Sequence, residues 1–213
     1  MTIHAYQEIY LSNIQDALGD AFDYAINMCD IPGNIFIQLF VISSISERIE
    51  NGDISILNGC SGIDIARKII NETTGKEIDY AQTYSIKRSS EYWIGYVIAY
   101  YQWYSSRKFS EIFNVLSYDE LLKMYNTLHE ADISKFVEVA DKRIKEYYPE
   151  TNLKRIRNIY GISQSELSRL SGVSLRSIQM YEQRNKDINK ASVTTLYHIS
   201  RVLGCSIEDL IEK

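Results

Sequence analysis

The sequence predicts an all-α protein, and three observations support this fold class. Helix-breaking residues are scarce, because the chain of 213 residues contains only two prolines and ten glycines. Apolar residues recur at helical spacing in most segments. Helix-start and helix-stop signals separate these segments. With 45% hydrophobic and 24% charged residues, the composition is that of a soluble globular protein.

The first two helices are expected before residue 50. Residues 5–28 place these apolar side chains near helical spacing: Ile9, Ile14, Leu18, Phe22, Ala25 and Ile26. Pro32 suits the first turn of a second helix, where a backbone N–H has no partner within the helix. We expect this helix to run to about Ile49 and to end at the turn-forming sequence ENGD.

Further helices are expected up to residue 148. Ser61 and Asp64 have the spacing of a capping box, which marks a helix start. In chain order the expected elements are a helix over 61–73, a polar loop over 75–88, an apolar central helix over 89–108, and amphipathic helices over 117–130 and 133–148. Pro149 disfavours helical geometry at Tyr148, so we place a domain boundary there, between residues 1–149 and 150–213.

No catalytic, metal-binding or cofactor-binding pattern is found. The three cysteines, Cys29, Cys60 and Cys205, are far apart and form no CxxC pair. The histidines lack metal-ligand spacing, and no glycine-rich phosphate loop or GxSxG motif occurs. We therefore expect no metal, no cofactor and no enzyme. Cysteine usage, the lack of a secretory signal and the lack of an apolar stretch of ~20 residues predict a cytoplasmic protein outside the membrane.

Charge is divided unevenly along the chain. Residues 151–213 contain ten Lys and Arg against six Asp and Glu, a balance of +4. Residues 1–150 contain 13 basic and 22 acidic residues, a balance of −9. A basic end on an acidic body is typical of nucleic-acid-binding proteins.

The basic segment predicts five short helices. Thr151 caps the first, and Gly161 ends it. The sequence S-x-x-E at 163–166 opens the second as a capping box, Gly172 breaks it, and Ser174 caps the third. A fourth helix is expected over 190–203 and a short fifth one over 206–211. The expected core residues are Leu153, Ile156, Leu167, Leu170, Ile178, Tyr181, Val193, Leu196, Ile199, Val202 and Leu203.

Two short helices joined by a glycine-containing turn match the helix-turn-helix signature. The stretch GISQSELSRLSGVSLRSIQMYEQ and the later LGCSIEDLI resemble the Cro/Xre class of phage-repressor DNA-binding domains. Ser168 stands where this class usually has alanine, and Arg184 stands at a common glycine position. We expect Asn185, next to Arg184, to supply the left-handed turn. The resemblance implies a five-helix, lambda-repressor-like domain that binds double-stranded DNA and regulates transcription, as a repressor.

The resemblance also implies which side chains contact DNA, with the recognition helix over 174–183 in the major groove. The expected DNA-binding residues are Gln164, Ser174, Leu175, Arg176, Ser177, Gln179, Arg184 and Lys186. Arg176 has the geometry to contact guanine, Gln179 adenine and Leu175 a thymine methyl group. Ser177, Arg184 and Lys186 are expected at phosphates, which position the protein without specifying sequence. We expect Lys154, Arg155 and Arg157 to form a solvated helix face.

The aromatic residues of the central helix have two interpretations. They either fill the core or form a surface that binds a partner, since Tyr and Trp are enriched in binding hot spots. The candidate partner-binding residues are Tyr92, Trp93, Tyr96, Tyr100 and Trp103.

Three functions remain open for residues 1–149, which resemble uncharacterised helical domains of bacterial regulators and antitoxins through the stretches 36–53 and 89–104. The first is dimerisation, which would let a homodimer span two DNA half-sites about 34 Å apart. The second is an antitoxin role, in which this half neutralises a toxin protein and the basic half autoregulates the operon. The third is an enzyme with a DNA-binding tail, which requires a cofactor or a deep polar pocket in this half.

Overall fold

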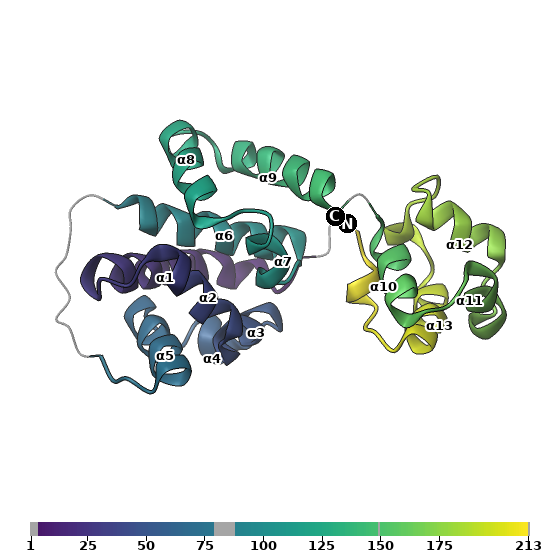
Figure 1. The fold of residues 1–213 in the computed structure, drawn as a ribbon, viewed down its shortest axis with the longest axis horizontal. Helices are drawn as coiled ribbons and strands as arrows, with labels where there is room; N and C mark the ends of the chain where they lie inside the picture. The colour runs from purple at the N-terminus through teal and green to yellow at the C-terminus, as the bar shows by residue number, and fades with distance from the viewer. Residues whose placement is uncertain (1–3, 79–87, 149, 213) are drawn as a thin grey trace. The chain divides into compact units, whose positions relative to one another are not determined.

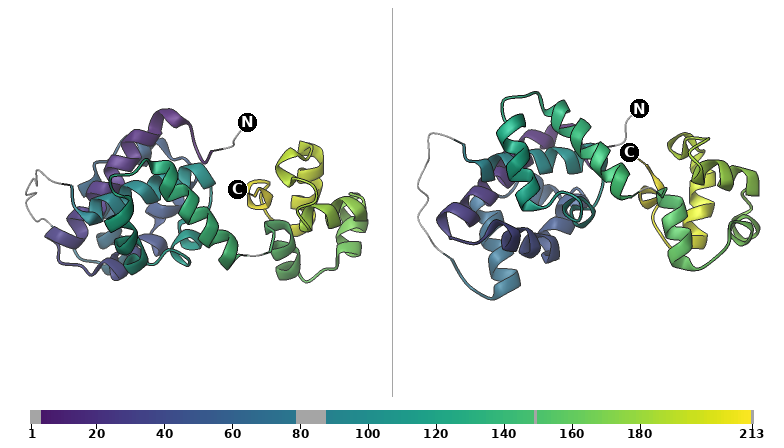
Figure 2. Two further views of the ribbon diagram at one scale, coloured as in Figure 1. Left: turned by 90° about the horizontal axis from the view of Figure 1, so that it is seen from above. Right: turned by 45° about the horizontal axis from the view of Figure 1, so that its top comes forward.

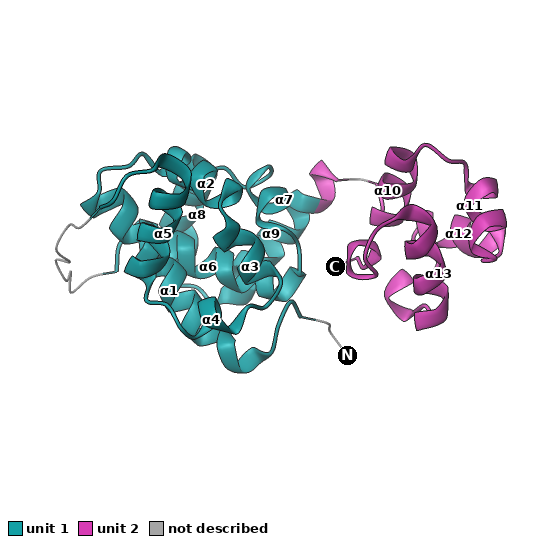
Figure 3. Cartoon of the chain, turned by 90° about the horizontal axis from the view of Figure 1, so that it is seen from below, with its two compact units in different colours: residues 1–144 teal, residues 145–213 magenta. Residues whose placement is uncertain are grey.

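A computed structural model describes residues 4–78, 88–148 and 150–212, and every regular element in these residues is a helix (Figures 1 and 2). The all-α prediction is therefore confirmed. The chain divides into two compact units, residues 1–144 and 145–213 (Figure 3). Most of the predicted loop over 75–88, as well as Pro149, lies outside the described residues. No helix in the described ranges is long and apolar enough to cross a membrane.

The centre of the first unit is the pair α1 (Leu11–Asp23) and α6 (Ser90–Ser105), which pack together more extensively than any other pair of described elements (Figure 1). Two glycines allow the backbones of α1 and α6 to lie close together. A Cβ atom at Gly95 would lie 2.2 Å from the carbonyl oxygen of Leu18, and one at Gly19 would lie 2.7 Å from the ring of Tyr92. The apolar helix expected to be central is thus an inner helix, as predicted.

The other helices of this unit surround the central pair. They are η1 (Glu8–Tyr10), η2 (Tyr24–Met28), α2 (Gly33–Ile42), α3 (Ser44–Glu50), α4 (Ile54–Leu57), α5 (Gly62–Thr74), α7 (Phe109–Phe113), α8 (Tyr118–Leu128) and α9 (Ile133–Tyr147). Helix α5 packs on α1, and α8 packs on α6 and α2. The ring of Phe22 meets those of Phe36 and Phe40 edge to face, which closes the core between α1 and α2.

Several predicted boundaries in this unit are wrong. The helix expected over 5–28 begins only at Glu8 and continues without a break through η1, α1 and η2 to Met28, and Ile9 is 76% exposed. The helix expected to run to Ile49 breaks at Ser43. The backbone of Ser43 is extended, and its hydroxyl donates a hydrogen bond to the Phe40 carbonyl, so α2 ends before α3 begins. Helices α4 and α7 were not predicted. The capping box at Ser61 and Asp64 is confirmed at the start of α5.

The second unit contains α10 (Asn152–Tyr160), α11 (Gln164–Ser171), α12 (Leu175–Glu182), η3 (Ile188–Lys190), α13 (Val193–Leu203) and η4 (Glu208–Leu210). These elements surround one core of buried side chains: Leu153, Leu167, Ile178, Tyr181, Ile188, Leu196, Ile199, Leu203 and Leu210. Helices α10, α11 and α13 each end at a glycine in the left-handed conformation, which are Gly161, Gly172 and Gly204 in turn.

Two core predictions in this unit are wrong. Leu170 is 49% exposed, because Ser171 rather than Leu170 takes the inward position after Leu167 and donates its hydroxyl to the Leu167 carbonyl. Val193 is 73% exposed, because the helix expected from residue 190 begins only at Val193, after the cap Ser192. The expected fifth helix is the single turn η4.

Candidate DNA-binding interface

The link between α11 and α12 is a short turn held by side-chain hydrogen bonds. Gly172 begins it at a φ of 70°, which a glycine adopts without strain. The Ser168 hydroxyl donates to the carbonyl oxygen of Val173 at 2.7 Å. Ser168 is one of the two departures from the family pattern, and its hydroxyl fastens the turn to α11. The sequence alone showed only that Ser168 stands where this class usually has alanine.

Side chains cap both helices of this pair. The Ser163 hydroxyl accepts from the Glu166 N–H, and the Glu166 carboxylate accepts from the Ser163 N–H at 2.8 Å, which confirms the predicted capping box. Hydrogen bonds from the Ser163 N–H and the Ser163 hydroxyl to this carboxylate lower the pKa of the Glu166 carboxyl. At α12 the Ser174 hydroxyl accepts from the Ser177 N–H at 3.2 Å. The first turn of α12 contains no acidic residue, so the positive end of the helix dipole faces its surroundings without an opposing carboxylate on that turn.

A buried ion pair joins α10 to α12. Arg157 donates two hydrogen bonds to the Glu182 carboxylate, at 2.6 Å and 2.9 Å, and a third to the Ile162 carbonyl at 2.7 Å. The Arg157 and Glu182 side chains are only 10% and 1% exposed. This bonding raises the pKa of the Arg157 guanidinium above its usual value. Arg157 was expected on a solvated face, and that prediction is wrong. Its position four residues after Leu153 places both on the inward face of α10.

Helix α11 joins the same cluster through Gln164. Its side-chain amide donates to the Glu182 carboxylate at 2.7 Å. Helices α10, α11 and α12 are therefore held together at one carboxylate, and the angle between α11 and α12 is set by buried polar bonds as well as by the apolar core.

Comparison with known families agrees with this geometry. A family model described as helix-turn-helix matches residues 153–210. The C-terminal unit is a helix-turn-helix domain of the Cro/Xre type. No curated protein matches the chain. No solved structure matches it either. Domains of the Cro/Xre type are DNA-binding modules of transcription regulators, and the second helix of their motif is α12 here.

The structure places the predicted groove residues of this Cro/Xre domain on one side of α12. Ile178, Tyr181 and Glu182 face the core, whereas Arg176 is exposed and Leu175 is 36% exposed. Gln179 is half-buried and follows Arg176 by three positions, so the two side chains share a face. Gln183, seven positions after Arg176, extends this face and was not predicted. The spacing of three and seven residues from Arg176 places Gln179 and Gln183 on one helix face, and this spacing is the sequence signal for Gln183 as a residue of that face.

The serines are less available than the sequence suggested. The Ser174 and Ser177 hydroxyls lie 2.9 Å apart and bond to each other at the start of α12. Ser174 is exposed, and Ser177 is half-buried. Both are thus positioned at the helix start, with their hydroxyls engaged in capping.

Arg184 has an unexpected conformation. It adopts the left-handed conformation itself, at a φ of 57°, so the expectation that Asn185 would do so is wrong. Its side chain forms an ion pair with Glu212 at 3.1 Å. Lys186 places its ammonium group 5.2 Å from the centre of the Tyr181 ring. Both cations lie just after α12, and each already has a partner within the chain.

The aromatic residues of α6 mainly fill the core of the first unit. Tyr92 and Trp103 are 7% and 5% exposed, and the Trp103 indole donates to the Tyr6 carbonyl at 2.9 Å. Trp93, Tyr96 and Tyr100 are half-buried. These five residues, predicted as partner-binding candidates, therefore do not form one exposed surface.

Proposed function

We propose that this protein is a sequence-specific, double-stranded DNA-binding transcriptional repressor whose recognition helix is α12. The observation that carries the proposal is the outward face of α12, with Arg176 and Gln183 exposed and Gln179 half-buried between them, on a helix held on its inner side by the Arg157–Glu182 pair. A rigid helix with long polar side chains on its outer face suits the major groove, which admits an α-helix and displays a distinct pattern for each base pair.

The base-reading roles follow from side-chain chemistry. Arg176 contacts guanine through two parallel hydrogen bonds, and Gln179 contacts adenine in the same way. Leu175, at the start of the helix, contacts a thymine methyl group. The amide of Gln164 is held by Glu182 at the start of α11, and a helix N-terminus favours a phosphate.

The phosphate-contacting roles belong to Ser177, Arg184 and Lys186. Arg184 exchanges Glu212 for a DNA phosphate, since half of its side chain is already exposed in that ion pair. These contacts position the domain on DNA without reading sequence.

A homodimer is the form in which we expect the protein to act. One Cro/Xre domain reads a short site, and two domains reading half-sites about 34 Å apart gain affinity and sequence specificity together. Residues 1–149 supply the surface for this dimer in our proposal. Occupation of a promoter by the dimer excludes other proteins from that DNA, which is the simplest route to repression.

The proposal is tested by selecting binding sites from random duplex DNA with the full chain and with Arg176→Ala. We expect a dyad-symmetric site for the original protein, loss of preference at one base position in each half-site for the variant, and an affinity that falls steeply with salt. Arg201→Ala is the matched control, because it removes the same charge from an exposed position on α13. Absence of any enriched site at low and high salt refutes sequence-specific binding by this chain.

An antitoxin role is a second candidate, favoured by the balance of −9 on residues 1–150 against +4 on residues 151–213. An acidic half complements a basic toxin, while the basic half binds the operon. Expression together with the neighbouring genes tests this role. A neighbour whose product is toxic alone, harmless with this chain, and bound to it at fixed stoichiometry supports the antitoxin role; no such neighbour refutes it.

A further inference from the structure

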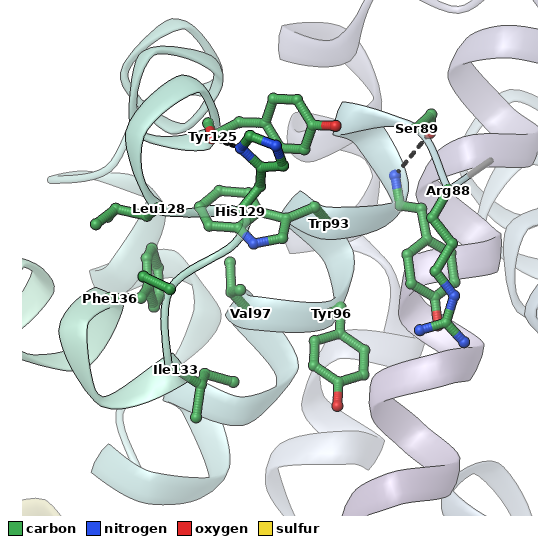
Figure 4. Close-up of a pocket in the computed structure, with 12 residues that line it drawn as sticks. Arg88, Ser89, Trp93, Tyr96, Val97, Tyr125, Leu128, His129, Ile133 and Phe136 are labelled. Atoms are coloured by element: carbon green, nitrogen blue, oxygen red, sulfur yellow. Dashed lines mark hydrogen bonds between the residues drawn. The ribbon is translucent and has the colours of Figure 1, made fainter.

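The first unit contains a pocket of about 320 Å³ between α6, α8 and α9 (Figure 4). Trp93 and Tyr96 of α6 form its floor with Val97, Tyr125 of α8 lies on one side, and Phe136 of α9 lies on another. The volume is at the lower end of the range for small-molecule sites, and most of the lining is aromatic or aliphatic.

The aromatic rings that line this pocket hold one another in place. The Trp93 ring meets the Tyr125 ring at 5.6 Å and 69°, and it meets the Phe136 ring at 5.6 Å and 82°. These edge-to-face contacts come from α8 and α9, so two other helices restrain Trp93. The pocket is therefore preformed, which lowers the entropic cost of binding a flat ring.

The pocket has a positive charge at one end and no negative charge in the described part of its lining. Among the described residues that line it, Arg88 is the only one with a permanent charge, and none is a carboxylate. The Arg88 guanidinium lies 4.4 Å from the centre of the Tyr92 ring, and it reaches Asp16 only at 3.4 Å, with 67% of its side chain exposed. A guanidinium has five N–H donors in a planar fork that matches a carboxylate, so most of them remain for a ligand.

We propose that this pocket binds a small aromatic carboxylate, with its ring on Trp93 and Tyr96 and its carboxylate at Arg88. The aromatic lining selects a flat apolar body, and the single guanidinium at one end selects a negative charge there. The volume accommodates a body of one or two fused rings. The pocket lies entirely within residues 88–136, so the proposal stands independently of the DNA-binding function.

Isothermal titration of the full chain with 2-naphthoate, without DNA, tests the proposal. The uncharged isostere 2-naphthamide and the cation 2-naphthylmethylamine are titrated beside it. We expect one naphthoate per chain, bound at least tenfold more tightly than either analogue, because the carboxylate forms charge-assisted hydrogen bonds with Arg88, the amide forms weaker neutral ones, and the ammonium is repelled. Absence of binding at millimolar naphthoate, or tighter binding of the amine, overturns the proposal.

Two variants locate the site. Arg88→Ala removes an exposed side chain and should weaken naphthoate at least tenfold while changing naphthamide less than twofold. Ala131→Trp adds an indole at an exposed bend on the pocket rim and should abolish binding of both. Lys142→Ala, an exposed cation of α9 outside the lining, is the matched control and should change neither. Unaltered naphthoate binding in Arg88→Ala and Ala131→Trp refutes this site.

Discussion

Arg157 and Glu182 form a two-point ion pair in the core of the DNA-binding unit, with N···O distances of 2.6 Å and 2.9 Å. They lie 25 positions apart in sequence, and the pair joins α10, the first helix of the domain, to the C-terminal end of α12. Burial makes such a pair costly to form but far more costly to break, because the remaining charge has no water to solvate it.

Removal of one partner should therefore destabilise the second unit strongly. We expect Arg157→Ala to cost about 3–5 kcal/mol, since it leaves the Glu182 carboxylate buried without its cation. Both tryptophans lie in the first unit, so protection of the α10–α12 amides against hydrogen exchange is the appropriate measurement. Lys154→Ala is the control, because its ion pair with Glu150 is about half exposed and should cost less than about 1 kcal/mol. Equal effects of the two changes would contradict the buried-pair argument.

The left-handed backbone of Arg184 predicts a difference between two substitutions. Arg184→Ala and Arg184→Gly both remove the ion pair with Glu212, but only glycine also relieves the strain of a φ of 57°. The glycine variant should be more stable than the alanine variant by about 1 kcal/mol, while both bind DNA more weakly. Hydrogen exchange of the second unit and DNA titration measure the two effects separately. A more stable alanine variant would show that position 184 does not keep this backbone conformation.

The contact between α1 and α6 predicts a large effect of one added methyl group. Gly95→Ala places a Cβ atom against the Leu18 carbonyl, a backbone atom that moves only if the helices separate, so we expect a loss of at least about 1–3 kcal/mol. Trp93 and Trp103 fluorescence during urea unfolding reports on this unit. Gly75→Ala, with no neighbour within 4 Å and a φ of 68°, should cost only the backbone strain of about 1 kcal/mol. A variant at Gly95 that is no less stable than the one at Gly75 would rule out this close approach.

Burial of Glu50 predicts that removing its charge stabilises the fold in a pH-dependent way. Burial raises the pKa of this carboxyl, although the Phe109 N–H donates to it at 2.6 Å and opposes the shift. Because the folded-state pKa exceeds the unfolded one, the charged form costs stability as the pH rises through the folded pKa. Glu50→Gln, whose side-chain oxygen still accepts from Phe109, should therefore raise the unfolding temperature at pH 7. The difference should vanish below the ordinary pKa of about 4.3. Thermal unfolding at pH 4 and pH 7 measures it, and a destabilised variant at pH 7 would contradict this account.

Local signals in the sequence were enough for the helix-turn-helix motif. Capping at Thr151, Ser163 and Ser174 and the turns at Gly161 and Gly172 depend on residues within a few positions of one another, so the helix starts and stops of this motif can be read without the rest of the fold. The match over residues 153–210 agrees with that interpretation.

Long-range contacts decided what local patterns left open. Arg157 and Lys154 are both cations on α10. Only Arg157 forms an ion pair with a buried carboxylate, because Glu182 lies on α12, which packs against the inward face of α10. The aromatic side chains of α6 surround that helix, and only its neighbours show that Trp103 is buried while Trp93 lines a pocket. By itself the sequence determined the fold class, the capped helices of the C-terminal unit and its DNA-binding type, because these depend on near neighbours along the chain. Only the tertiary structure decided which charged and aromatic groups lie inside, because burial depends on residues brought together from distant positions.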